Sequence, residues 1–125
     1  MTGSKPMTYT RYGFQGDVAF RRVDAIPEGY APAQPKGIVN GKPGHVAADS
    51  ETGHHHIIAA DSGTLYEGTD AGIAYLRLAE DSADVVHLRA HDTHGTITLL
   101  GGAGAVWQVV RQREFDGAAE RRAQD

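Results

Sequence analysis

Short apolar segments separated by glycine-rich turns are the feature that most restricts what this chain can fold into. The chain has 125 residues, of which 16 are glycine and five are proline. Turn dipeptides such as Asn40-Gly41 and Pro43-Gly44 lie between segments rich in β-branched and aromatic residues. This pattern leaves little room for long helices. It predicts an all-β fold, a small single-domain β-sandwich or barrel of about six to eight short strands.

Two of the expected strands carry clear signals of burial. Residues 73–78 are expected to form a strand, and the period of two along a strand predicts that Ala74, Leu76 and Leu78 share the buried face. Residues 105–113 form the longest expected strand, and its first half is apolar at both parities. A strand that is apolar on both faces is typical of the middle of a sheet.

The polarity of the two ends predicts three regions within the chain. Residues 1–14 are small and polar, so we expect a flexible N-terminal arm. Residues 15–115 contain the expected strands and form one β-domain, which is the natural count for a chain of this length. Residues 116–125 have helical composition but are too polar for a core, which predicts a short polar C-terminal helix or tail.

Composition excludes several classes of function. The absence of cysteine excludes disulfides and thiolate metal sites, so any metal would need histidine and carboxylate ligands. The net charge of −4 gives no overall electrostatic attraction for nucleic acid, so a nucleic-acid partner is not expected. No apolar run resembles a signal peptide or approaches the roughly 20 residues of a membrane span. We therefore expect a cytoplasmic protein without membrane partners, or a virion protein if the gene is carried by a phage.

Histidines are the residues that point most directly to chemistry. The chain has seven, and six of them fall within residues 53–58 and 87–94. His54 and His56 are two apart, a spacing that places both imidazoles on one face of a strand. His91 and His94 have a spacing that suits a turn. Because imidazole is the commonest ligand for transition metals, these four histidines predict a site for zinc, nickel, copper or ferrous iron.

The remaining histidines and neighbouring carboxylates leave alternatives open. His55 is expected to face away from its neighbours, while His45 and His87 are each isolated in a strand and are expected to be structural. A carboxylate from Asp92 or Glu51 would change the site towards the pattern of two histidines and one carboxylate typical of non-haem iron. Equally, the histidine clusters are compatible with ordinary polar residues at loop ends.

No motif for nucleophilic or phosphate chemistry accompanies the histidines. Residues 101–104 are glycine-rich, but neither Gly-Lys-Ser/Thr nor a helix follows them, so a hairpin bend is expected. The Gly-x-Ser-x-Gly elbow of hydrolases is absent. The sequence thus favours a non-enzymatic domain, with no catalytic or cofactor-binding residue other than the metal ligands.

Four motifs together resemble a known pattern, and they span about Gln15 to Phe115. They are Gln15-Gly16-Asp17-Val18, Gly53-His54-x-His56, His91-x-x-His94 and residues 109–115, Val-Val-Arg-Gln-Arg-Glu-Phe. The set resembles an uncharacterised family of small bacterial and phage β-proteins. The resemblance implies that the two histidine motifs pair, and it supplies no activity. This chain departs from the pattern at His55 and at Gly101-Gly102, where a proline-glycine turn is usual.

The histidine spacing also resembles that of cupins, in which His-x-His and a later histidine bind a metal inside a β-barrel. In this chain the glutamate that follows His-x-His is missing, and Ala59, Ala60 and Asp61 stand in its region. The resemblance would imply a small metalloenzyme that uses iron or manganese.

Three hypotheses follow from the sequence. The first is a metal-binding β-domain with a structural or assembly role, in which His54, His56, His91 and His94 hold zinc or a similar divalent ion. The second is a phage virion, head-decoration or capsid-stabilising protein that forms homo-oligomers or contacts a neighbouring structural protein through its terminal arms. The third is the cupin-like metalloenzyme.

Overall fold

The protein is an all-β domain, as its sequence predicts. A computed structural model describes residues 7–15, 18–49, 55–70, 72–88 and 95–111, which contain twelve strands. The strands are β1 (Met7–Tyr9), β2 (Tyr12–Gln15), β3 (Val18–Val23), β4 (Ala31–Pro32), β5 (Gly37–Val39), β6 (Lys42–Asp49), β7 (His55–Ala59), β8 (Gly63–Glu67), β9 (Ile73–Leu78), β10 (Ser82–Leu88), β11 (Ile97–Leu100) and β12 (Val106–Arg111). This number exceeds the expected six to eight because four strands, β1, β2, β4 and β5, are too short to give a periodic signal. Within the same ranges, no helix is long and apolar enough to cross a membrane.

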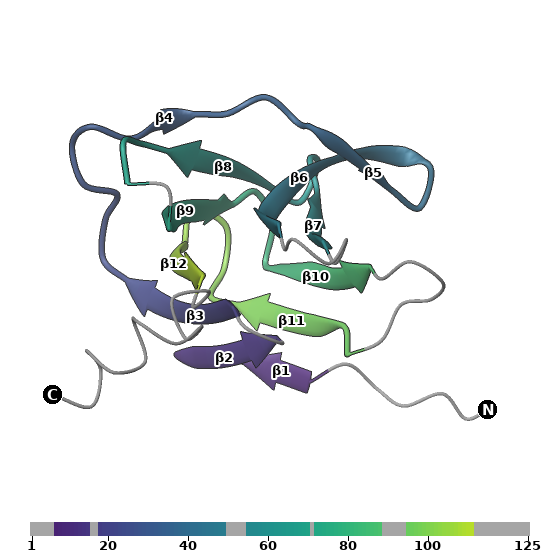
Figure 1. The fold of residues 1–125 in the computed structure, drawn as a ribbon. Coiled ribbons are helices and arrows are strands. Elements are labelled where there is room, and N and C mark those ends of the chain that lie inside the picture. The colour runs from purple at the N-terminus through teal and green to yellow at the C-terminus, as the bar shows by residue number, and fades with distance from the viewer. Residues whose placement is uncertain (1–6, 16–17, 50–54, 71, 89–94, 112–125) are drawn as a thin grey trace, which may run out of the picture.

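The strands form two six-stranded sheets that pack face to face (Figure 1). Sheet 1 has the order β1-β11-β10-β7-β6-β5, and sheet 2 has the order β2-β3-β12-β9-β8-β4. Neighbouring strands are antiparallel except for β1 and β11, which are parallel. β12 pairs with β3 on one side and β9 on the other, so the prediction of a central strand is confirmed.

The hairpin between β5 and β6 follows directly from its turn residues. Val39 pairs with Lys42, which leaves Asn40 and Gly41 as a two-residue turn. Both turn residues have positive φ, 54° at Asn40 and 78° at Gly41. Asparagine and glycine tolerate this region best, and a turn of this kind matches the twist of antiparallel strands. The predicted Asn-Gly turn is therefore confirmed.

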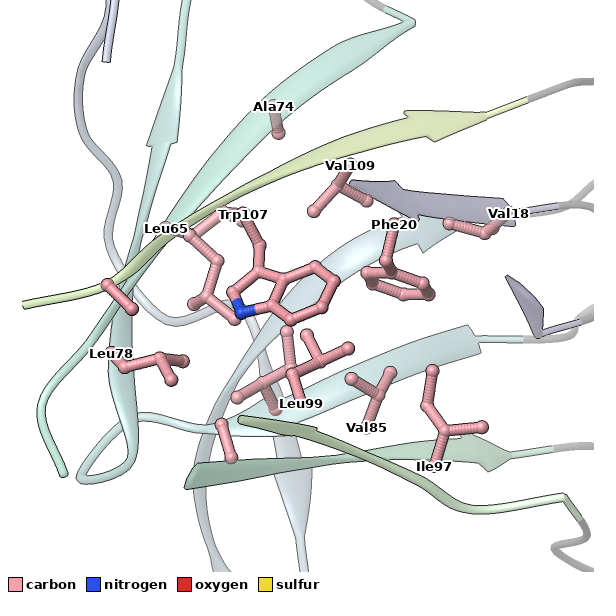
Figure 2. Packing of buried hydrophobic residues seen from close by; sticks show 14 residues of the cluster. Val18, Phe20, Leu65, Ala74, Leu78, Val85, Ile97, Leu99, Trp107 and Val109 are labelled. Atoms are coloured by element: carbon pink, nitrogen blue, oxygen red, sulfur yellow. The ribbon is translucent and has the colours of Figure 1, made fainter. Parts of the chain in front are cut away.

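The core lies between the two sheets and is dominated by aromatic and branched side chains. Trp107 and Phe20 are its largest fully buried members. Figure 2 shows both rings pointing from sheet 2 towards Leu99 and Val85 of sheet 1. The predicted buried face of β9 is confirmed, since its alternate apolar residues Ala74, Leu76 and Leu78 are 8%, 0% and 2% exposed. Burial of these side chains supplies the main favourable term for folding.

One end of this core is closed around Trp107, and we call it the Trp107 end. The indole Nε1 donates a hydrogen bond to the carbonyl of Leu100 at 3.1 Å. The guanidinium of Arg22 lies 5.9 Å from the centroid of the Trp107 ring, in the geometry of a cation–π contact. Its Nη1 lies 3.4 Å from the same Leu100 carbonyl. A ring that would otherwise bury an unpaired N–H is thus satisfied.

The N-terminal segment corrects the expectation of an arm over residues 1–14. Residues 7–9 and 12–15 are strands, and β1 and β2 lie side by side at one edge of the two sheets (Figure 1). The ring of Tyr9 lies against Gly13, where any side chain would run into it. This short polar segment gives no periodic signal in the sequence. Its order comes instead from pairing with other strands and from Tyr9 packing on the core. The rest of the predicted arm and the C-terminal tail lie outside the described residues.

Candidate functional site

The end of the sandwich opposite Trp107 carries two buried histidines, and we call it the histidine end. β7 begins and β10 ends at this end, with His56 paired to His87 and His55 paired to Leu88. Since side chains alternate along a strand, His56 falls on the same inner face as the core residue Ile58. The side chains of His56 and His87 are 1% and 7% exposed. β-Strand periodicity thus directs both imidazoles between the sheets.

The two imidazole rings are stacked. Their centroids are 4.4 Å apart and their planes differ by 13°. Because the ring faces are in contact, the nitrogen atoms of both rings point outward in the ring planes, where Nδ1 of His56 meets Oε1 of Gln15. A planar imidazole held in this way keeps a fixed direction for each of its nitrogen atoms, which is what a ligand-binding site requires.

Gln15 is the polar residue of sheet 2 that reaches this histidine pair. Its side chain is 3% exposed and lies at the end of β2. Nε2 donates to the carbonyls of Val85 at 2.8 Å and Gly95 at 2.7 Å. Oε1 lies 2.8 Å from Nδ1 of His56. One amide therefore connects β2 of sheet 2 with β7, β10 and the start of the β11 segment in sheet 1.

His45 is a third buried histidine, but it is separate from the stacked pair. It is 4% exposed, and it pairs with Ile58 on the inner face of β6. Burial lowers the pKa of His45, and the negative charge of Glu67 opposes this effect in part. Nδ1 of His45 is buried and has no hydrogen-bond partner among the residues that the structure describes. Its surroundings favour the neutral imidazole, which agrees with a structural role.

Charged residues of sheet 2 lie at the histidine end as well. A cavity of about 280 Å³ there is lined by Ala47 of β6 and by Glu67, Asp70 and Arg111, among other residues. Arg111 pairs with Val18, and the alternation along β12 directs its side chain inward. The opening between the sheets is consequently polar on both layers at this end.

The four predicted metal ligands differ in what can be said of them. His56 is described, whereas His54, His91 and His94 lie outside the described residues, as do the alternative carboxylates Glu51 and Asp92. The side chain of His55 lies outside them too. Among the described residues, no group of three or more histidine, cysteine, aspartate or glutamate side chains has the arrangement of a metal site.

Sequence reasoning missed two members of the cluster. His87 has the same parity as Ala83 and Val85 on β10, so strand alternation alone places it inward with them. Gln15 gave no such signal. On β2 the aromatic Tyr12 and Phe14 point outward while Gly13 and Gln15 point inward, which is the reverse of the usual polarity. A buried glutamine is recognised only from the partners that satisfy its amide.

Two antiparallel-rich sheets with a histidine pair and a buried amide between them define a small β-sandwich domain with a polar interior at one end. The chain belongs to the family described as a domain of unknown function (DUF8820), whose model matches residues 14–112. The match covers nearly the same stretch as the resemblance seen in the sequence. No curated protein and no solved structure matches the chain.

Proposed function

We propose that this domain binds a divalent transition metal ion, with zinc as the first candidate, and that the ion has a structural or assembly role. The observation that carries the proposal is the environment of His56, whose buried ring is stacked on His87 and hydrogen-bonded at Nδ1 to Gln15. The proposed ligands are His54, His56, His91 and His94, as the sequence predicts.

The hydrogen bond to His56 is of the kind found behind metal ligands. In a metal-binding histidine, the ring nitrogen that does not hold the metal almost always donates an N–H hydrogen bond to a carboxylate, a carbonyl oxygen or water. This hydrogen bond fixes the orientation of the ring. The contact between His56 Nδ1 and Gln15 Oε1 at 2.8 Å supplies this support. Buried polar side chains also reduce stability unless they are fully satisfied. A bound ion would offset the stability cost of burying this polar cluster.

The chain order brings the other proposed ligands next to described members of the cluster. His54 precedes His56 by two residues, and His94 directly precedes Gly95. The carbonyl of Gly95 is held by Gln15, the residue that also contacts His56. Both histidine motifs therefore continue from points attached to the same amide, which supports a joint site.

Metal analysis of protein purified without a histidine tag tests the proposal. We expect bound zinc or nickel, and a rise in thermal stability when either ion is added to the metal-free protein. Free zinc at roughly 100 times Kd would stabilise the fold by about 2.7 kcal/mol. His54→Ala and His94→Ala should each weaken binding, because each removes a proposed ligand and leaves the buried His56–His87 stack intact.

His45→Leu is the matched control, since His45 is buried but has no place in the proposed ligand set. This variant should bind zinc as the parent protein does. Absence of bound metal together with no thermal shift from zinc or nickel contradicts the proposal. Equal affinities of the parent, His54→Ala and His94→Ala contradict the ligand set.

A second candidate function is self-association as a structural protein, such as a phage head-decoration or capsid-stabilising protein. One observation favours it. Tyr12 and Phe14 are 61% and 56% exposed and lie together on the outer face of β2. Adjacent exposed aromatic side chains are typical of protein–protein contacts. For self-association, the partner at this surface is a second copy of the chain.

Sedimentation velocity over a range of concentrations tests self-association. The double substitution Tyr12→Ser and Phe14→Ser should shift the protein towards the monomer. Ile38→Ser is the control, because Ile38 is also a large exposed apolar residue, at 68%, on the distant edge strand β5. A parent protein that stays monomeric at the highest concentration rules out this candidate.

A further inference from the structure

The orientation of the Gln15 amide is determined by the carbonyl groups around it. A glutamine amide has an NH2 group with two donor hydrogens and a carbonyl oxygen that only accepts. Nε2 lies 2.8 Å from the carbonyl oxygen of Val85 and 2.7 Å from that of Gly95. The opposite orientation would place Oε1 against two other acceptors. Both hydrogens of Nε2 are therefore used by the backbone, and Oε1 is the atom that faces His56.

This orientation decides which nitrogen of His56 carries the proton. Oε1 of Gln15 is an acceptor, and it lies 2.8 Å from Nδ1 of His56. Nδ1 must be the donor. A neutral imidazole has one N–H, so its lone pair is then on Nε2. Nε2 is also buried. The stack on His87 keeps the ring plane in place, so the direction of this lone pair is fixed as well.

We infer that Gln15 is a positioning residue that holds His56 as the Nδ1–H tautomer, so that Nε2 is its ligand atom. The tautomer assignment stands on the hydrogen bonds alone. Its consequence for metal binding rests on the proposed function.

The same amide also holds Gly95, the residue that follows His94 in the sequence. Gly95 has a φ of +70°, a conformation that favours glycine. Its carbonyl is held by Gln15 at 2.7 Å. The backbone is thus attached to the His56 partner one residue after a proposed ligand. Loss of the Gln15 amide should affect the His56 tautomer and the anchoring of Gly95 together.

Ring nitrogen NMR of the metal-free protein tests the tautomer. At about pH 8, above the usual titration of histidine, we expect a protonated Nδ1 and an unprotonated Nε2 at His56. Gln15→Met removes the acceptor, so His56 should shift towards the Nε2–H form. Gln108→Met is the control, because the Gln108 amide donates to the hydroxyl of Tyr75 at 3.0 Å, far from His56 in the pairing of the strands. The control should leave the His56 signals unchanged.

An Nε2–H tautomer in the parent protein overturns the inference, whether or not the variants fold. So does an unchanged His56 tautomer in folded Gln15→Met. If that variant does not fold, Gln15→Asn provides the second test, since its shorter side chain withdraws the same amide from His56.

Zinc titration then separates this inference from the proposed function. Removing a residue that orients a ligand typically lowers metal affinity by about 10- to 100-fold. We expect a loss of this size in Gln15→Met and no change in Gln108→Met. A parent protein with the Nδ1–H tautomer but without zinc affinity ends the metal proposal and leaves the assignment of His56 intact. Equal zinc affinity in the parent and Gln15→Met shows that Gln15 has no positioning role in metal binding.

Discussion

The two ends of the sandwich interior are filled by side chains of different chemistry. At the Trp107 end the indole is fully buried, and its single polar atom donates to the Leu100 carbonyl. At the histidine end, Gln15, His56 and His87 occupy the space between the sheets. Apolar side chains stabilise a core by leaving water, whereas buried polar groups must find partners to avoid a net cost.

Apolar and polar side chains lie in different halves of one small core. The apolar half contains the largest buried side chains, Trp107 and Phe20, and the indole donates one hydrogen bond, to the Leu100 carbonyl. The polar half depends on the three contacts of a single amide. A domain built only for stability would continue the apolar pattern to both ends. The polar half is therefore the place to look for function.

The largest effect is expected from truncating the residue that fills the apolar end. Trp107→Ala removes a fully buried ring and should lower the free energy of unfolding by about 3–5 kcal/mol. Urea unfolding followed by circular dichroism measures this loss. Trp107→Phe, which retains much of the ring volume, should lose less. A loss below about 1 kcal/mol for Trp107→Ala would show that the apolar end is not what stabilises the fold.

A smaller loss is expected from removing the amide of the polar end. Gln15→Leu leaves the carbonyls of Val85 and Gly95 without their donor, and an unsatisfied buried group costs about 1–3 kcal/mol. Gln108→Leu is the matched control, because it removes one partly buried hydrogen bond from the same sheet. Equal losses in the two variants by urea unfolding would contradict a special role for the Gln15 contacts.

Much of this arrangement could be predicted from local sequence patterns. The strand at 73–78 has the predicted bounds, and Asn40 and Gly41 form the predicted turn, because strand periodicity and turn chemistry are local properties. The burial of Ala74, Leu76 and Leu78 follows from the same alternation. These features depend on neighbours in the chain rather than on distant contacts.

The polar cluster could be predicted only in part, because its contacts join distant strands. The Gln15 amide contacts Val85 and Gly95, which are 70 and 80 residues away in the sequence. The stack of His56 on His87 depends on the register between β7 and β10. Histidine spacing pointed to His56 as a site residue, but a single sequence does not give the register between strands such as β7 and β10, which no tight turn connects.

A pH-dependent difference is expected from His45, the buried histidine outside the cluster. Because burial lowers its pKa in the folded state, the unfolded chain binds more protons as the pH falls. Stability from neutral His45 is present above the ordinary pKa of about 6.5 and is lost as the pH falls below it. Glu67 opposes this effect, and its charge is itself 3.6 Å from Lys36 Nζ.

His45→Leu should therefore flatten the fall in stability below the ordinary histidine pKa. The measurement is urea unfolding of both proteins across this pH range. The buried Nδ1 without a described partner also makes a leucine tolerable at neutral pH. A variant with the same pH profile as the parent would show that other groups, rather than His45, control acid unfolding.

The smallest effects are expected from surface ion pairs at the two ends. Lys42 Nζ lies 3.6 Å from Asp61 at the Trp107 end, and Lys36 Nζ lies 3.6 Å from Glu67, where β8 reaches the histidine end. Such exposed pairs contribute about 0.2–1 kcal/mol. Lys42→Ala and Lys36→Ala should thus both unfold in urea close to the parent, and the differences should shrink further in high salt. A larger loss of unfolding free energy at one end would mean that the surfaces of the two ends differ as well. Equal small losses would mean that the two ends differ only in the interior, where Trp107 and Gln15 lie.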